Sequence, residues 1–353
     1  MKILYITFID FGRGRSGSSV RPQKMYEAFK REGHCVTLLE CQQNKRRLRK
    51  QRVKKIIHGL RTEVPDICYV EPPAGPFFNR IDLTLLKKIH ELHVPIGLFY
   101  RDALWLYADW WGVKGLKAAV LRYMHKRDIK VFSTCCDIVY FPSLSMAKLF
   151  ERYRFTKVDT LPPACENCST RHKTIQNAMI YVGGVSKAYG TDILLEAYKL
   201  LNSGDIRYHL NLVCRKAELE NYLSGLSQCE WLHIYHVQDE ALLPLYEQSD
   251  CGIIPTRKDQ YMDFAVHVKM FEYIGNALPI ISTDCTETAN FIRKTECGIV
   301  CRDNADSLAE AIRNFYRDPE KISQLQQNAC TAAAENRWTD RVNKVVADLN
   351  DCR

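Results

Sequence analysis

The chain has 353 residues, of which 46% are hydrophobic and 26% charged, with 17 Gly, 13 Pro and a formal net charge of +9. This composition excludes a collagen-like or largely disordered chain, and the length predicts two domains of roughly 100 to 200 residues each. No apolar run approaches the roughly 18 residues that a membrane-spanning helix needs. The opening MKILYITFID lacks a small-residue cleavage site, so it predicts a buried strand and not a signal peptide.

Short apolar runs alternate with helical patterns over residues 1–161. The runs predict strands at 2–8, 35–40, 66–71, 95–100, 137–141 and 157–161. The patterns between them predict helices near 20–33, 45–62, 79–92, 113–131 and 143–152. Such alternation is typical of a parallel sheet with helices on both faces.

The alternation starts again after Leu161-Pro162-Pro163-Ala164, a stiff proline segment suited to an interdomain link. Strands are expected at 178–185, 208–214, 231–236, 251–255, 278–282 and 297–301. Helices are expected near 190–202, 215–226, 239–249, 267–276, 286–294, 304–317, 319–335 and 337–349. The sequence therefore predicts two doubly wound α/β domains, with a ligand site where the carboxyl ends of their strands face a central cleft.

Charge is divided unevenly along the chain. Residues 1–160 hold 30 Lys and Arg against 15 Asp and Glu, whereas residues 161–353 hold 20 against 26. The basic first half favours an anionic partner, either nucleic acid or a membrane surface. The basic run KRRLRKQRVKK at 45–55 leaves open a nonenzymatic nucleic-acid-binding protein, but only electrostatics supports it, because no RNA-binding motif accompanies the run.

Cofactor and metal motifs are missing from the sequence. The 15 cysteines are odd in number and scattered in apolar runs, which indicates reduced thiols of a cytoplasmic protein. Cys165 and Cys168 form the one C-x-x-C, with His172 nearby, and a zinc site normally needs a second ligand pair. There is no dinucleotide fingerprint, Walker A motif or D-x-D, so we expect no cofactor and no metal.

Lys269 and Glu272 lie three residues apart in a predicted helix and so share a face. A lysine suits a phosphate, and a carboxylate can accept hydrogen bonds from both hydroxyls of a ribose. By itself such a pair is commonly a solvated ion pair.

Four segments in order resemble the nucleotide-binding domain of GT-B glycosyltransferases, specifically the group 1, or family 4, retaining enzymes. They are YVGGVSKAYGTDILLEAY at 181–198, LPLYEQSDCGIIP at 243–255, KMFEYIGNALPIIST at 269–283 and ETANFIRKTECGIVCRDNADSLAEAI at 287–312. The resemblance implies the GT-B fold, with an acceptor domain over 1–163, a donor domain over 164–335, and a segment 336–353 that contains Trp338 and returns to the first domain.

The resemblance also assigns donor-site residues. Glu272 matches the second of two family glutamates, while Phe264 stands eight residues earlier, where the first is usual, and Asp263 is the nearest acidic substitute. The family's basic residues on the glycine loop are displaced here. Gly183 and Gly184 of the loop are donor-site candidates. The basic candidates for the diphosphate are, in falling order of preference, Lys269 and Lys187, with Arg257 and Lys258 in reserve.

In the first domain, the Gly-Ser-rich segment from Gly14 to Ser19 precedes a helix that Pro22 is expected to begin, where the family approaches the phosphates and acceptor. The residues of this segment that could contact the acceptor or the donor phosphates are Gly17, Ser18, Ser19 and Arg21. Arg101-Asp102 ends a buried strand where family members often have His-Asp, so Asp102 could position an acceptor hydroxyl or accept its proton.

The sequence thus predicts a transferase that moves a sugar from a nucleoside diphosphate sugar, preferably a UDP-sugar, to a hydroxyl of a glycan or lipid-linked glycan in bacterial surface polysaccharide assembly. The resemblance implies retention of configuration, with the leaving phosphate oxygen assisting proton removal. An inverting reaction with Asp102 as base and a nucleotide-sugar epimerase stay open.

Residues 105–131 predict attachment to the cytoplasmic face of an anionic membrane. Aromatic residues precede a helix with an apolar side edged by basic residues, a pattern suited to a membrane interface. The aromatic residues are Trp105, Tyr107, Trp110 and Trp111, the apolar side is Val113, Leu116, Val120, Tyr123 and Met124, and the basic edge is Lys114, Lys117, Arg122, Lys126 and Arg127.

Overall fold

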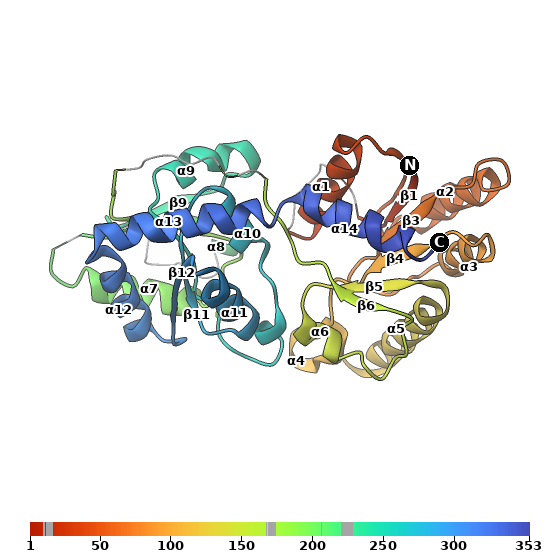
Figure 1. Ribbon diagram of the computed structural model, residues 1–353. Coiled ribbons are helices and arrows are strands. Elements are labelled where there is room, and N and C mark those ends of the chain that lie inside the picture. Colours follow the sequence, from red (N-terminus) through yellow and green to blue (C-terminus); the bar gives the residue numbers. More distant parts are fainter. Residues whose placement is uncertain (10, 12–16, 167, 169–173, 206, 220–228) are drawn as a thin grey trace. The chain divides into compact units, whose positions relative to one another are not determined.

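The computed structural model describes the chain except residues 10, 12–16, 167, 169–173, 206 and 220–228. The described chain forms two compact units, one of residues 1–163 with 338–353 and the other of residues 164–337 (Figure 1). The chain crosses between the units directly after Pro163 and again before Trp338.

The first unit is built on six parallel strands in the order β2-β1-β3-β4-β5-β6. The strands are β1 (Lys2–Thr7), β2 (Cys35–Glu40), β3 (Ile67–Glu71), β4 (Ile96–Phe99), β5 (Ile138–Phe141) and β6 (Val158–Thr160). Strands β3, β4 and β5 are buried throughout, because helices cover both faces of the sheet.

The helices of this unit follow the strands in turn. They are α1 (Gly17–Arg31), α2 (Arg46–Gly59), α3 (Arg80–Glu91), α4 (Ala108–Trp111), α5 (Gly115–Cys135), α6 (Leu144–Lys148) and α14 (Trp338–Asn350), with a 3₁₀ turn η1 at Leu104–Leu106. Helix α14 packs on α1, and the Tyr140 hydroxyl donates a hydrogen bond to Asp348 at 2.9 Å. The last helix of the chain therefore completes the first unit.

The second unit repeats the plan with six parallel strands in the order β12-β11-β10-β7-β8-β9. The strands are β7 (Ala178–Val182), β8 (His209–Val213), β9 (Leu232–Tyr235), β10 (Cys251–Ile254), β11 (Ile280–Thr283) and β12 (Gly298–Cys301). Two buried apolar clusters fill the space between this sheet and its helices.

The helices of the second unit are α7 (Thr191–Leu201), α8 (Lys216–Leu219), α9 (Leu243–Glu247), α10 (Val268–Gly275), α11 (Thr286–Thr295), α12 (Ala305–Tyr316) and α13 (Pro319–Ala334). Two 3₁₀ turns, η2 (Asp239–Leu242) and η3 (Met262–Phe264), lie between them. Asn304 and Asp318 accept backbone hydrogen bonds at the starts of α12 and α13, as helix-capping residues do.

The predicted fold class is confirmed, and the elements differ in detail. Helix α1 begins at Gly17, five residues before the expected start at Pro22. Gly17, Ser18 and Ser19 are therefore helical, whereas the preceding residues 12–16 lie outside the described part of the chain. Pro22 has no amide hydrogen to donate, yet α1 continues through it. The Tyr5 hydroxyl donates a hydrogen bond to the Pro22 carbonyl at 2.9 Å.

Candidate functional site

The candidate donor site lies in the second unit, at the carboxyl ends of β7, β10 and β11. These three strands are parallel neighbours, so the loops that follow them leave the sheet at one edge. The first loop joins β7 to α7 through Gly183, Gly184 and Gly190, and the second joins β10 to α10. This is the edge at which doubly wound sheets bind ligands.

Lys269 is the most distinctive side chain of this edge. It is 9% exposed, and its ammonium lies 4.1 Å from the centroid of the Tyr181 ring and 5.9 Å from that of Tyr189. It makes no hydrogen bond or ion pair with any residue that the structure describes. Burial lowers the pKa of Lys269 to about 7, although the nearby Glu272 carboxylate opposes the shift. The fold thus holds a desolvated cation against an aromatic face.

Glu272 follows one turn later on α10 and is half-buried. The Tyr246 hydroxyl from α9 donates a hydrogen bond to its carboxylate at 3.3 Å. A carboxylate has about four acceptor positions and can accept several hydrogen bonds at once. The structure therefore places Lys269 and Glu272 on neighbouring turns, as the sequence predicts.

The glycine loop leaves space for these side chains. A Cβ on Gly183, whose φ is +154°, would lie 3.1 Å from the Lys269 ammonium, and a Cβ on Gly184 would lie 3.1 Å from the Tyr189 ring. The Tyr181 hydroxyl donates to the Gly184 carbonyl at 2.6 Å and so braces the loop. Gly190, with φ +70°, then turns the chain into α7, whose first amides offer a positive helix end.

The other basic candidates have partners or lie outside this group. The Arg257 guanidinium pairs with Asp192, and Lys258 donates to the Asp284 carbonyl at 3.1 Å. Lys187 is exposed. Lys187 lies in the glycine loop itself, and the Arg257 amide donates to the Ala188 carbonyl of that loop at 3.2 Å. Lys269 is the buried basic candidate, with its ammonium next to Gly183.

Asp263 has a structural role that the sequence did not indicate. Its two carboxylate oxygens accept from the Thr286 amide at 2.8 Å and the Thr286 hydroxyl at 2.9 Å. Asp263 therefore holds the start of α11, where the helix end favours a negative charge. Its assignment as a substitute for the missing family glutamate stays a prediction.

Sequence reasoning missed the aromatic and histidine neighbours of Lys269. Tyr181 immediately precedes Val-Gly-Gly, and this position at the end of a buried strand was the available signal. His267 precedes α10, and its Nε2 lies 3.3 Å from the Thr256 hydroxyl. Burial and the Lys269 charge lower the pKa of His267 to about 3, so its ring is neutral at physiological pH.

In the first unit, Glu71 gathers two of the predicted acceptor-site residues. Its carboxylate lies 3.2 Å from Arg21 and 3.7 Å from Arg101, and it accepts a 2.8 Å hydrogen bond from the Tyr69 hydroxyl. Arg21 is buried and also lies 3.6 Å from the Phe99 ring centroid. Arg21 and Arg101 therefore belong to one ion-pair cluster at the end of β3. Ser19 is buried in α1, and the surroundings of Gly17 and Ser18 lie outside the described part of the chain.

Asp102 is half-buried at the end of β4 and lines a pocket with Tyr100, Arg101, His125 and Asp128. Its carboxylate accepts the Leu104 amide at 2.7 Å, which starts the 3₁₀ turn η1. The His125 ring stacks on Trp105 with 4.9 Å between the ring centroids. Burial lowers the pKa of His125 to about 4, so its ring is neutral at physiological pH. The pocket thus presents polar groups at the sheet edge that the sequence predicts.

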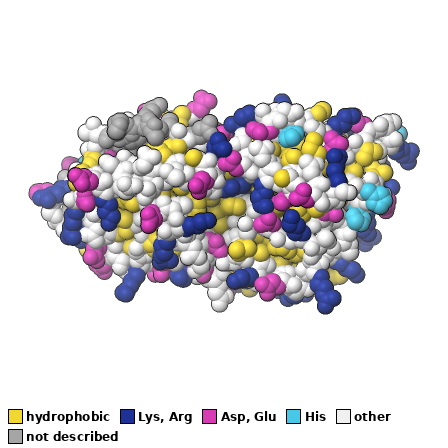
Figure 2. Space-filling view, viewed as in Figure 1, with side chains coloured by type: hydrophobic (Ala, Val, Ile, Leu, Met, Phe, Trp, Pro, Cys, Tyr) yellow, Lys and Arg dark blue, Asp and Glu magenta, His cyan; other side chains and the backbone are white. Residues whose placement is uncertain are grey.

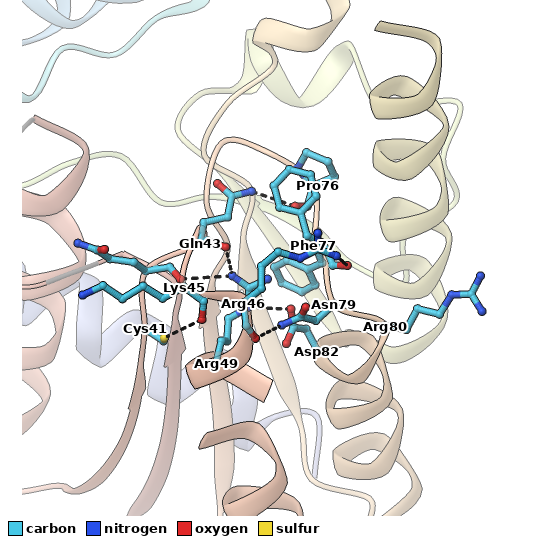
Figure 3. Close-up of polar contacts among 12 residues, drawn as sticks. Cys41, Gln43, Lys45, Arg46, Arg49, Pro76, Phe77, Asn79, Arg80 and Asp82 are labelled. Carbon is cyan, nitrogen blue, oxygen red and sulfur yellow. Dashed lines mark hydrogen bonds and ion pairs between the residues drawn. The ribbon is translucent and has the colours of Figure 1, made fainter. Parts of the chain in front are cut away.

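The basic run at 45–55 forms most of α2, and one of its arginines is a core residue (Figure 3). Arg49 is fully buried, pairs with Asp82 at 3.0 Å and donates to the Gln43 carbonyl at 2.5 Å. Arg46 donates to the Phe78 carbonyl at 3.2 Å. The run is therefore in part a structural element of the first unit, with its other basic residues on the exposed face of α2.

Within the described residues, no group of three or more His, Cys, Asp or Glu side chains is arranged to hold a metal ion. His172, which the sequence places near the C-x-x-C, lies outside the described residues. No helix in the described ranges is both long enough and apolar enough to span a membrane.

Comparison with known proteins identifies the second unit. The family model "Glycosyl transferases group 1" matches residues 176–318, which contain the glycine loop, Lys269 and Glu272. No curated protein matches the chain in sequence. Residues 176–318 therefore form a group 1 glycosyltransferase domain.

Solved structures extend the likeness to both units. The sucrose-phosphate synthase of Thermosynechococcus elongatus matches with a TM-score of 0.71 at 13% identity, over 99% of this chain and 98% of that one. An α,α-trehalose-phosphate synthase (UDP-forming) of Burkholderia vietnamiensis matches with a TM-score of 0.65 at 11% identity, over 99% and 98%. A trehalose-6-phosphate structure from E. coli, bound with UDP-2-fluoro glucose, matches with a TM-score of 0.63 at 11% identity, over 98% of each chain.

The two parallel sheets define the GT-B fold. The chain therefore has the GT-B fold and contains a group 1 glycosyltransferase domain over residues 176–318. Among the functions that the sequence left open, the domain match supports the transferase.

Proposed function

We propose that the protein transfers a sugar from a UDP-sugar to a hydroxyl of a glycan or lipid-linked glycan in bacterial surface polysaccharide assembly. The transfer retains the anomeric configuration and uses no metal ion. The observation that carries the proposal is the buried Lys269 ammonium beside the glycine loop. This ammonium forms no ion pair within the described part of the chain, although the Glu272 carboxylate is near enough to oppose the fall of its pKa.

A bound diphosphate would supply a negatively charged ion-pair partner for the Lys269 ammonium. Burying an ammonium without a counterion is costly, so a fold that keeps one at a ligand-binding edge is suited to an anionic ligand. The first amides of α7 add a positive helix end to the same loop. Glu272 then accepts hydrogen bonds from the ribose hydroxyls, and Tyr246 holds the carboxylate in place.

These groups also serve the reaction. The bond between the sugar and the diphosphate breaks, a bond to the acceptor oxygen forms, and the acceptor proton passes to the leaving phosphate oxygen. Lys269 stabilises the negative charge that develops on the leaving diphosphate. Asp102 of the first unit positions the acceptor hydroxyl, because its carboxylate lines the pocket next to Arg101. In the inverting alternative, Asp102 would take the proton itself.

The choice of UDP rests on the structural neighbours. One is a UDP-forming synthase and another is bound with UDP-2-fluoro glucose. Their identities to this chain are 11%, so the donor assignment is carried by likeness of fold together with the Lys269 and Glu272 geometry.

The outer face of α5 supports attachment to a membrane. Leu116 is 82% exposed and Tyr123 is 70% exposed, and with Val120 they follow one another at spacings of four and three residues, which puts them on one face. The opposite face, including Ile129 and Phe132, is buried in the unit. The apolar residues are therefore not used by the core.

Basic residues surround this apolar face. Lys114, Lys117, Lys126 and Lys130 are exposed on or next to α5. Lys and Arg side chains project where α2 and α5 lie in the space-filling view (Figure 2). Each basic residue near an anionic leaflet contributes about 1 kcal/mol, so a few give reversible attachment. Trp105 is not part of this surface, because it is buried against His125 and donates to the Tyr100 hydroxyl at 2.9 Å.

A donor and acceptor panel tests the catalytic proposal. We expect thermal stabilisation by UDP above that by GDP, ADP and CMP, and transfer from UDP-sugars to glycan or lipid-linked acceptors with chelator present. If the protein transferred sugar only to sugar phosphates, the proposed glycan or lipid-linked acceptor would be wrong. If another nucleotide stabilised the protein selectively, that nucleotide and not UDP would be assigned as the donor's carrier.

Liposome sedimentation tests the membrane proposal. We expect binding to anionic vesicles at low salt, weaker binding at high salt, and a loss of binding in the double variant Leu116→Ser and Tyr123→Ser. Leu243→Ser, which alters an exposed leucine of the second unit, should behave like the unaltered protein. Equal partitioning onto neutral and anionic vesicles would contradict this mode of attachment.

A further inference from the structure

Two cysteines of the second unit lie in direct contact. The Cys168 and Cys330 sulfur atoms are 2.7 Å apart, although 162 residues separate them in the sequence. Cys168 belongs to the segment that enters the unit after Pro163, and Cys330 lies on α13, which leads to the second crossing at Trp338. Both sulfurs are present as free thiols.

The nearby Cys165 is directed elsewhere. Its thiol lies 3.3 Å from the Asn336 carbonyl and 3.5 Å from the Ala333 carbonyl, and its backbone amide also donates to Asn336 at 2.9 Å. The C-x-x-C of the sequence is therefore not the closely spaced pair. Cys168 is instead aligned with a cysteine from a distant helix.

We propose that Cys168 and Cys330 form a reversible disulfide, which makes this pair a redox modification site of the protein. The sulfur atoms need to approach by only about 0.7 Å to reach the length of a disulfide bond. The described residues hold no metal-ligating group that would explain the two thiols instead. The inference rests on this geometry alone and is independent of the proposed substrates.

A small-molecule disulfide such as glutathione disulfide is the oxidant. The half-buried Cys168 attacks it as a thiolate, releases one glutathione and carries the other as a mixed disulfide. The Cys330 thiolate then displaces the second glutathione. Two protein thiols and one glutathione disulfide thus yield one protein disulfide and two glutathione molecules.

The reaction is expected to be slow at neutral pH. Burial raises the pKa of Cys168 to about 12, and the hydrogen bond with Cys330 adds to the shift. Because only the thiolate attacks, the rate should rise about tenfold for each pH unit below that value.

The pair also contacts the helix of the donor site. The Ala277 amide, just beyond α10, is near enough to the Cys168 sulfur to lower the pKa of that thiol, and a Cβ on Gly275 would lie 2.9 Å from the Cys165 Cβ. Helices α10 and α13 pack together. The disulfide would therefore tie the entering segment to α13 at the end of the helix that carries Lys269 and Glu272.

Peptide mapping of the full chain tests the proposal. The protein is incubated with glutathione disulfide at pH 7.5 and 8.5, blocked with N-ethylmaleimide and digested. Cleavage after Glu166 separates Cys165 from Cys168. We expect a crosslinked peptide containing Cys168 and Cys330 that forms faster at pH 8.5 and disappears with reductant.

Variants and a stability readout complete the test. Cys168→Ser and Cys330→Ser should each abolish the crosslink, while Cys352→Ser, at an exposed cysteine, should leave it unchanged. Oxidation should raise the Tm of the unaltered protein by several degrees and not that of Cys330→Ser. A lasting glutathione adduct on Cys168, a Cys165–Cys168 crosslink, or modification of exposed Cys35 without the crosslink would overturn the proposal, and each can be seen in the unaltered protein.

Discussion

The Lys269 ammonium lies 4.1 Å from the centre of the Tyr181 ring, and the two residues come from a helix and a strand 88 positions apart. The ring face offers a weak attraction to the cation without neutralising it. A buried ammonium is thereby kept available for an anion.

Removing either donor-site side chain should weaken nucleotide binding. Hydrogen bonds to charged groups contribute about 1.5 to 3 kcal/mol, so Glu272→Ala and Lys269→Ala should each lower UDP affinity by about ten- to a hundredfold. Calorimetric titration measures this. Lys199→Ala, which alters an exposed lysine on α7, should bind UDP normally. Unchanged affinity in both site variants would refute the donor-site assignment.

UDP affinity should fall as pH rises above about 7. The pKa of Lys269 is lowered to about 7, and diphosphate binding favours the protonated form. The decline should approach tenfold per pH unit at most and should vanish in Lys269→Arg, whose guanidinium stays charged. Affinity titrations from pH 6 to 9 decide this.

The same shift affects stability with the opposite sign. Between about pH 7 and the unfolded value near 10.5, the unfolded chain holds a proton that folded Lys269 has lost. This group's contribution to the free energy of unfolding therefore rises with pH over that range. Urea unfolding of the ligand-free protein should show the slope, and Lys269→Met should lack that part of it.

Asp102→Asn should separate charge from shape. The amide oxygen can still accept the Leu104 amide, so the turn η1 should persist. We expect turnover to fall by about ten- to a hundredfold, the effect of losing a charged hydrogen bond, with UDP affinity unchanged. Product NMR on the unaltered enzyme reads the anomeric configuration. An inverted product, together with a larger loss of turnover in Asp102→Asn, would assign Asp102 as the general base. Full turnover in Asp102→Asn would show that Asp102 has no role in the reaction.

Arg49 should be a stability residue of the first unit. Arg49→Met leaves the buried Asp82 carboxylate without its partner, and removing one member of a buried pair typically costs about 3 to 5 kcal/mol. The double variant with Asp82→Leu should recover much of the loss. Lys50→Ala, on the exposed face of α2, should change the free energy of unfolding by less than about 0.5 kcal/mol. If the Arg49→Met and Lys50→Ala variants lost equal free energy of unfolding, the Arg49–Asp82 ion pair would not be the source of the loss.

Gly183→Ala should weaken UDP binding through the loop. Its Cβ would lie 3.1 Å from the Lys269 ammonium, and φ +154° is unfavourable for alanine. Gly59→Ala is the matched control, since its Cβ would meet no atom within 4 Å. A Gly183→Ala protein with normal UDP affinity would mean that the close approach is unimportant.

Periodicity alone predicted both sheets, because short apolar runs bounded by polar helices leave a parallel α/β arrangement as the way to bury them. The Lys269 and Glu272 pair was also readable, since spacing on a helix determines which side chains share a face. Only the tertiary structure decided which charged residues have partners. Arg257 pairs with Asp192, Arg49 with Asp82 and Arg101 with Glu71, and each partner is at least 30 positions away in the sequence. Ion pairing, burial and the contact of Cys168 with Cys330 depend on which segments the fold brings together. Local sequence patterns cannot predict them, because the partners are far apart in the sequence.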